Sequence, residues 1–172
     1  VAFCMNFITE SAGMLADPTA GVLTTKEAKA LINFLNKKVA SDFVRFFSGS
    51  GHRHIAVLKD ANGFEALSAK TQSPESAIGR KIEDVLPKGP GEELMRKLMY
   101  DARLLLQGHE INQVRVDLGE NPANMIWLWG QGQRAALDRF EKKYGKKGAA
   151  ITAVDLVRGL AKLIGFDLIN VK

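Results

Sequence analysis

The sequence is poor in the residues that build disulfides and metal sites. It has one cysteine, Cys4, and three histidines among its 172 residues. A single cysteine excludes a disulfide within the chain and is typical of the reducing cytoplasm, where we expect the protein to lie. The histidines, His52, His54 and His109, form no HExxH pattern, and no CxxC pair is present. We therefore expect no metal site built within this chain.

Long apolar runs and familiar catalytic signatures are also missing. No apolar run approaches the ~20 residues that a membrane-spanning helix needs, so we expect no membrane partner. Residues 1–9 carry no basic segment ahead of the apolar one, so we predict a strand there and no signal peptide. No GxSxG elbow and no P-loop occurs, which excludes the usual hydrolase and nucleoside-triphosphate signatures. Cys4 lies on this predicted strand without an activating neighbour, which favours a small core residue over a nucleophile.

The composition that remains is that of a folded domain. Hydrophobic residues make up 46% and charged residues 25% of the chain, which indicates neither disorder nor a membrane protein. A chain of this length is typical of one domain, so we predict a single domain over residues 1–172. The net charge of +5 favours an anionic partner. Because the basic residues are spread along the chain, we expect a phosphorylated metabolite, and nucleic acid is the weaker alternative.

Both tryptophans lie within residues 121–132, which we predict to form the central strand of the fold. Because side chains alternate across a strand, Met125, Trp127 and Trp129 share one face, and Ile126 and Leu128 share the other. We expect both faces to be covered. The strand ends in a Gly-Gln-Gly tripeptide, where glycine lets backbone amides approach a ligand. A plain connecting turn is the alternative interpretation of this tripeptide.

Helical and extended patterns alternate ahead of this strand. Thr24 and Glu27 form a capping-box pattern that opens a helix. Its apolar positions share one face and are Leu31, Ile32, Leu35 and Val39. Residues 42–47 and 52–58 predict a hairpin of two strands, with a turn at residues 60–63 after it. Residues 68–88 lose periodicity and predict a long loop.

The longest predicted helix runs from about residue 90 to Gln107, and a second follows over residues 110–118. The expected inward positions of the longest helix are Leu94, Leu98, Met99, Ala102 and Leu105. Later segments predict helices at 134–144 and 155–164 and strands at 149–154 and 166–171. This order predicts an α/β (α+β) fold in which helices pack on a mixed β-sheet.

The best candidate for binding an anion is the Gly/Ser loop at residues 49–51, which leads into His52 and Arg53. A guanidinium group can donate two parallel hydrogen bonds to a phosphate or a carboxylate. We expect the backbone amides of the loop to add neutral donors around the same oxygens. The alternative is that Arg53 only caps the edge of the sheet.

Several stretches together resemble the cofactor-independent (2,3-bisphosphoglycerate-independent) phosphoglycerate mutases of the archaeal type, within the alkaline phosphatase superfamily. Their order and approximate spacing agree along nearly the whole chain. The stretches are Asn6-Phe7-Ile8-Thr9, Gly51-His52-Arg53, Leu86-Pro87-Lys88-Gly89, Asn121-Pro122-Ala123-Asn124, Trp127-Leu128-Trp129-Gly130, Phe140-Glu141-Lys142-Lys143-Tyr144-Gly145 and Ala153-Val154-Asp155-Leu156-Val157-Arg158-Gly159.

The resemblance implies that this chain is the inserted domain of a larger glycolytic isomerase. In that family the phosphorylated serine and the ligands of two divalent ions lie before and after a region like this one. It therefore implies a substrate-binding domain for the interconversion of 3-phosphoglycerate and 2-phosphoglycerate, with Mn or Mg held outside this chain. Arg53, His52 and Asn6 would bind the phosphoglycerate. The partner would be the catalytic domain of the same protein.

Three positions depart from the family pattern. Cys4 stands where the family tends to have arginine, Val22 where it has arginine or histidine, and Glu75 where its Pro-His-Asp loop has histidine. Basic and polar side chains that suit an anion are thus replaced by small, apolar or acidic ones. These departures support a second hypothesis, a divergent domain of the same fold that is non-catalytic or has been re-purposed for binding.

Overall fold

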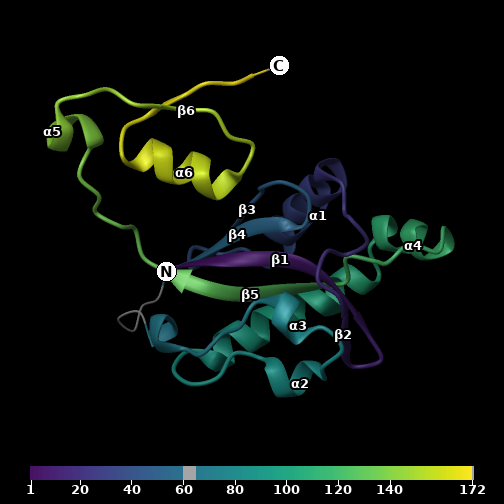
Figure 1. The fold of residues 1–172 in the computed structure, drawn as a ribbon. Helices are drawn as coiled ribbons and strands as arrows, with labels where there is room; N and C mark the ends of the chain where they lie inside the picture. Colours follow the sequence, from purple (N-terminus) through teal and green to yellow (C-terminus); the bar gives the residue numbers. More distant parts are fainter. Residues whose placement is uncertain (60–64, 172) are drawn as a thin grey trace. The chain divides into compact units, whose positions relative to one another are not determined.

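The computed structural model describes residues 1–59 and 65–171, and Figure 1 traces the chain. Contacts divide the chain into two compact units, Val1–Gln133 and Arg134–Lys172. The sequence predicts a single domain over residues 1–172, whereas the contacts separate the last segment from the rest. The turn predicted at residues 60–63 lies outside the described residues.

An antiparallel sheet forms the larger unit, and β1 (Ala2–Ser11) is its central strand. β1 pairs with β4 (Arg53–Leu58) on one side and with β5 (Met125–Gly132) on the other. β3 (Val44–Phe47) pairs with β4, which confirms the predicted hairpin. β2 (Met14–Asp17) folds back against the end of β1.

β5 is an edge strand, so its prediction as the central strand is wrong. Within the part of the chain that the structure describes, β5 pairs with β1 alone. Nearly all side chains of β1 from Phe3 to Glu10 are buried, whereas burial in β5 ends at Leu128. A strand that is buried on both faces belongs in the middle of a sheet, and β1 meets that condition over a longer run.

Helices α1 (Thr25–Lys38) and α3 (Glu92–Gln107) pack against the sheet, α1 on β3 and α3 on β5. The capping box of Thr24 and Glu27 opens α1 as predicted. α4 (Glu110–Asp117) follows α3. The predicted loop at 68–88 contains two short helical segments, η2 (Pro74–Ala77) and α2 (Ile82–Val85), and a further one, η1 (Glu65–Ser68), precedes it. None of the described helices is long and apolar enough to cross a membrane.

Two inward positions predicted for α3 are wrong. Leu98, Met99 and Ala102 are buried as expected, but Leu94 is 41% exposed and Leu105 is only partly buried. The core contacts at the two ends of the helix come from Met95 and Leu106 instead. Met95 takes the place of Leu94, and Leu106 takes the place of Leu105. At each end of the helix the buried position is therefore one residue later than the pattern of leucines predicts.

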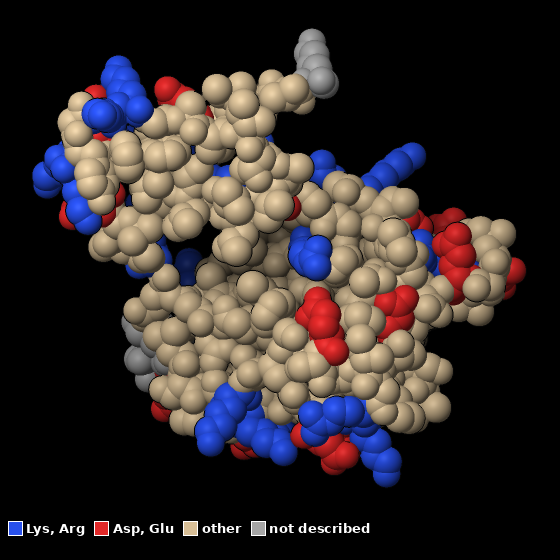
Figure 2. All heavy atoms as spheres, in the orientation of Figure 1, with Lys and Arg blue, Asp and Glu red and all other residues tan. Residues whose placement is uncertain are grey.

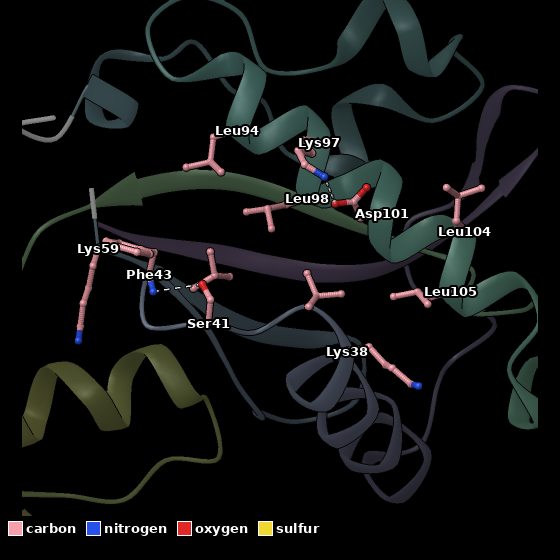
Figure 3. Close-up of a pocket in the computed structure, with 12 residues that line it drawn as sticks. Lys38, Ser41, Phe43, Lys59, Leu94, Lys97, Leu98, Asp101, Leu104 and Leu105 are labelled. Carbon is pink, nitrogen blue, oxygen red and sulfur yellow. Dashed lines mark hydrogen bonds and ion pairs between the residues drawn. The ribbon is translucent and has the colours of Figure 1, made fainter. Parts of the chain in front are cut away.

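The displaced leucines line a groove of about 750 Å³ between α3 and the segment that joins α1 to β3. Figure 3 shows Leu94, Leu98 and Leu105 on one wall and Phe43 on the other. The groove is also lined by Lys38, Lys59 and Lys97. The Nζ of Lys97 lies 2.6 Å from Oδ2 of Asp101. None of the predicted site residues lines this groove.

The smaller unit contains α5 (Phe140–Tyr144), β6 (Ala149–Ala150), α6 (Asp155–Leu163) and β7 (Asp167–Leu168). β6 and β7 pair in parallel, with α6 as the connection between them. Each predicted element is therefore present in part: the helix predicted at 134–144 begins only at Phe140, and both strands are shorter than expected. Together with the antiparallel sheet of the larger unit, this pairing agrees with the predicted α/β class.

Candidate functional site

The register of the sheet brings two of the three predicted site residues together. Asn6 on β1 and Arg53 on β4 are directly paired, so their side chains lie on the same face. Cys4 lies on this face because it is two residues from Asn6, and Trp129 joins them as the β5 partner of Cys4. We call the surface formed by Cys4, Asn6, Arg53 and Trp129 the site face.

Asn6 has a free donor on this face. Its side chain is 1% exposed, and its Oδ1 accepts a hydrogen bond of 3.1 Å from the indole N–H of Trp129. Its Nδ2 is buried and has no hydrogen-bond partner among the described residues. Buried polar atoms are nearly always paired, so an unpaired amide donor is unusual. This donor could satisfy an oxygen of a ligand.

His52 lies in the turn just before β4, and its carbonyl oxygen accepts from the Phe7 N–H at 2.9 Å. Its Nε2 is also buried without a partner in the described part of the chain. Burial lowers the pKa of the His52 imidazole, and the charge of Arg53 acts in the same direction, while Glu75 and Asp17 oppose both. The ring is therefore neutral near pH 7 and can exchange one hydrogen bond with a ligand.

The loop before His52 does not supply the amide donors that its glycines predict. The Gly49 N–H donates to Nδ1 of His54 at 3.0 Å, and the Gly51 N–H donates to Oγ1 of Thr25 at 3.1 Å. His54 itself faces the core, where its ring meets that of Phe7 at 5.0 Å, and burial lowers its pKa to about 4. Both glycine amides are thus used to hold the loop.

The Gly-Gln-Gly tripeptide of β5 is not a ligand loop either. Gly130 has a positive φ of 57°, at a point where the β1–β5 register shifts. The N–H of Gly130 donates to Oγ1 of Thr71 at 3.2 Å, and the side-chain Nε2 of Gln131 donates to the carbonyl of Ala69. The glycine therefore permits an irregularity in the strand, which lies against residues 69–71.

The structure locates the three residues that depart from the family pattern. Cys4 is exposed on the site face, so its prediction as a core residue is wrong, and partial burial raises the pKa of its thiol. Val22 is 82% exposed. Glu75, in η2, is exposed and close enough to His52 for its charge to favour the protonated imidazole.

Sequence patterns missed two residues beside this site, Asp17 and Arg115. The carboxylate of Asp17 accepts hydrogen bonds from its own loop and from Asn121, and these bonds hold its pKa at about 2 against the opposing effect of burial. Arg115 is 3% exposed and binds three other segments. Asp17 begins a turn-rich Asp-Pro-Thr sequence that could have been noticed. Arg115 has no such signal, because its loop partners are distant in sequence.

The face of the molecule drawn in Figure 2 shows no continuous basic stripe among the described residues. On the face in Figure 2, lysine and arginine side chains lie in small separate groups with acidic side chains among them. The described residues contain no cluster of three or more histidine, cysteine or acidic side chains that could hold a metal ion.

Comparisons with known proteins agree on one family. A family model described as 2,3-bisphosphoglycerate-independent phosphoglycerate mutase matches residues 1–112. The chain is 39% identical to the protein of that name from Methanosarcina mazei and 37% identical to 2,3-bisphosphoglycerate-independent phosphoglycerate mutase 2 from Methanothermobacter thermautotrophicus. Each alignment covers 99% of this chain but 42% of the relative, so the chain spans about two fifths of their length.

Solved structures show the same fold. The cofactor-independent phosphoglycerate mutase from Thermoplasma acidophilum matches 99% of this chain with a TM-score of 0.65 at 24% identity. The PH0037 protein from Pyrococcus horikoshii matches 98% with a TM-score of 0.66 at 21% identity. The match covers 46% of the first structure and 37% of the second, so this chain corresponds to part of each.

Proposed function

Because the chain belongs to the 2,3-bisphosphoglycerate-independent phosphoglycerate mutases, we propose that it supplies the substrate-binding part of such an enzyme. In this proposal the whole protein interconverts 3-phosphoglycerate and 2-phosphoglycerate through a phosphoserine that lies outside this chain. A divalent metal ion, Mn²⁺ or Mg²⁺, would also be held outside it. The remainder of the protein would be its catalytic partner.

The observation that carries this proposal is the pairing of Asn6 and Arg53 on the site face, with the buried Nδ2 of Asn6 unpaired among the described residues. A phosphoglycerate carries a phosphate and a carboxylate, and both are acceptors. The guanidinium of Arg53 offers two parallel donors to one of them. Asn6 adds a neutral donor whose desolvation cost is already incurred in the folded chain.

These residues would bind and orient the substrate and carry out no bond-breaking step themselves. The neutral imidazole of His52 would give or accept one hydrogen bond. Phosphoryl transfer depends mainly on positioning and on neutralising charge, and a clamp of this kind contributes to both. We place Arg53, His52 and Asn6 in these substrate-binding roles.

A second function is favoured by the exposed groups around the same site. Cys4 and Val22 add a thiol and an apolar side chain, and Glu75 adds a negative charge within range of His52. An acidic group disfavours an anionic substrate. A re-purposed binding domain of the same fold, without mutase activity, would account for these three residues.

Two assays of the full-length protein distinguish the mutase from the re-purposed binding domain. The protein is assayed with 3-phosphoglycerate in the presence of Mn²⁺ or Mg²⁺, and binding of 3-phosphoglycerate is measured by calorimetry. Turnover with binding supports the mutase, whereas binding without turnover supports the second function. A protein that neither binds nor turns over phosphoglycerate contradicts the proposal. The isolated 172-residue chain is expected to show no turnover with either metal, because the proposed serine and metal ligands lie outside it.

A further inference from the structure

Three consecutive residues beside the site adopt the left-handed backbone conformation. Ala20, Gly21 and Val22 have φ values of 51°, 64° and 56°. Residues other than glycine enter this region rarely, usually one at a time, and a β-branched residue there is a marked outlier. We call residues 20–22 the left-handed turn. Such a conformation persists only where the surrounding structure holds it in place.

The carboxylate of Asp17 holds the turn from inside its own loop. Oδ1 accepts from both the N–H and the hydroxyl of Thr19 at 2.7 Å, and Oδ2 accepts from the Gly21 N–H at 2.8 Å. Successive backbone amides in a bend of this kind bind anions. Here the chain provides the anion itself, so these amides are not available to a ligand.

Arg115 holds the turn from a different part of the chain. Its Nη2 donates to the carbonyl oxygens of Ala20 at 3.0 Å and Gly21 at 2.8 Å, and its Nε donates to the carbonyl of Asn121 at 3.0 Å. A Cβ on Gly21 would lie 2.6 Å from Nη2, so only glycine allows this approach. Asn121 closes the network by donating to Asp17 at 2.9 Å.

The guanidinium of Arg115 also bonds to acidic groups on both sides of it. Its Nη1 lies 2.9 Å from Glu27 on α1 and 3.2 Å from Glu120 beyond α4. Every nitrogen of this buried group therefore has a partner, which suits the rigid fork of arginine and not the single ammonium of lysine. These bonds together hold the left-handed turn and the Arg115 guanidinium in one relative position.

The turn that is held in this way lies next to the predicted substrate-binding residues. Asp17 is close enough to His52 for its charge to act on the imidazole. The Gly51 N–H bonds to Thr25, which lies three residues after Val22 at the start of α1. Val22 itself is 82% exposed, so its strained conformation does not serve the packing of the core.

We propose that Arg115 is a positioning residue for the substrate-binding site. It holds the left-handed turn so that position 22 is presented beside His52 and Arg53, and it does this without touching the ligand. The proposal rests on the proposed function, because the site that the turn borders is the phosphoglycerate site. Without the fork of Arg115, the turn should relax toward ordinary backbone conformations and the edge of the site should lose its shape.

The test compares Arg115→Lys with Arg96→Lys in full-length protein. Arg96 is a matched control, because it bonds to the carbonyl of Pro87 and pairs with Glu92 on α3, away from the turn. The affinity for 3-phosphoglycerate is measured by calorimetry. Hydrogen exchange is measured by mass spectrometry on peptides from residues 18–24 and from residues 3–9 of β1.

We expect Arg115→Lys to weaken binding at least tenfold and to speed exchange in residues 18–24 at least tenfold, with β1 unchanged. Arg96→Lys should change neither. Unchanged affinity, unchanged exchange in the turn, or equal acceleration in β1 would overturn the proposal, since the last result would indicate a general structural role.

A second substitution tests the role of strain. Val22→Gly removes the penalty of a positive φ, so the turn should persist with a weaker clamp. The loss of affinity caused by Arg115→Lys is measured in the wild-type background and again in the Val22→Gly background. It should be smaller in the Val22→Gly background, and an equal loss in both backgrounds would contradict the mechanism. If the wild-type protein does not bind 3-phosphoglycerate, the proposed function fails. Exchange in residues 18–24 then still decides whether Arg115 holds the turn.

Discussion

The indole N–H of Trp129 donates to Oδ1 of Asn6 over 3.1 Å. This bond orients the Asn6 amide, because the indole engages the oxygen and leaves Nδ2 as a donor without a partner in the described part of the chain. An edge strand thereby determines what a side chain of the central strand can offer to a ligand. The relationship links β1 and β5, the two strands that supply Asn6 and Trp129.

Trp129→Phe should weaken the binding of 3-phosphoglycerate by full-length protein about threefold to tenfold. The variant keeps the aromatic packing but loses one hydrogen bond, worth about 1 kcal/mol, so the Asn6 amide is free to rotate. Calorimetric titration measures the change. Tyr100→Phe is the matched control, since it also keeps an aromatic ring and loses one side-chain hydrogen bond, from the Tyr100 hydroxyl to Glu83, and it should leave affinity unchanged. Equal effects of the two variants would contradict the role of Trp129.

Arg53→Ala in full-length protein should reduce kcat/KM for phosphoglycerate by about ten- to over a hundredfold. A hydrogen bond to a charged group typically contributes ~1.5–3 kcal/mol, and Arg53 is exposed, so its loss should hardly change stability. Arg53→Lys keeps the charge but loses the two-pronged geometry, and should recover little of the activity. A lowered melting temperature with unchanged kinetics would instead favour the sheet-edge role.

Trp127→Ala should leave little folded protein. Trp127 is 1% exposed and is among the largest fully buried side chains. Removing a buried aromatic side chain typically costs ~3–5 kcal/mol, out of about 5–15 kcal/mol for a whole domain. Denaturant unfolding followed by circular dichroism measures the loss. Trp129→Ala, at a half-buried position, should cost less, and the reverse order would show that the packing of β5 is misassigned.

The left-handed turn should weaken in acid because of Asp17. Its carboxyl has a pKa of about 2 in the folded chain, against 3.8 as its ordinary value. A lowered pKa stabilises the fold above the ordinary value, and this contribution is lost as pH falls from about 3.8 through 2. Asp17→Asn lacks the contribution at every pH.

Unfolding free energies of wild type and Asp17→Asn, measured from pH 5 down to pH 2, should therefore converge as the pH falls. Ser41→Ala on the β3 side of the sheet provides a control, because it changes no titrating group. A constant difference between wild type and Asp17→Asn across this range would show that the ionised carboxylate contributes nothing to stability.

Local patterns predicted several elements correctly, for physical reasons that act over a few residues. The capping box at Thr24 and the stripe of Leu31, Ile32 and Leu35 depend only on helical spacing and neighbouring groups, and both are present. The hairpin of β3 and β4 is equally local. The family resemblance, now shown by the comparisons, rested on short motifs spread along the chain.

Other predictions failed where the outcome depended on distant partners. The leucines of α3 predict Leu94 and Leu105 in the core, but the neighbouring elements rotate the buried stripe toward Met95 and Leu106. The apolar character of Cys4 predicts a position in the core, yet its side chain is exposed on the site face.

The sequence by itself determined the longer helices α1 and α3, the family, and the pairing of β3 with β4, because each depends on neighbours in the chain or on motifs that can be read directly. Only the tertiary structure decided that β1 and not β5 is central, and that Asn6 lies opposite Arg53. It alone placed Arg115 against Ala20 and Gly21. Strand order and buried ion networks depend on which distant segments exclude water from one another, and short-range periodicity contains no information about that choice.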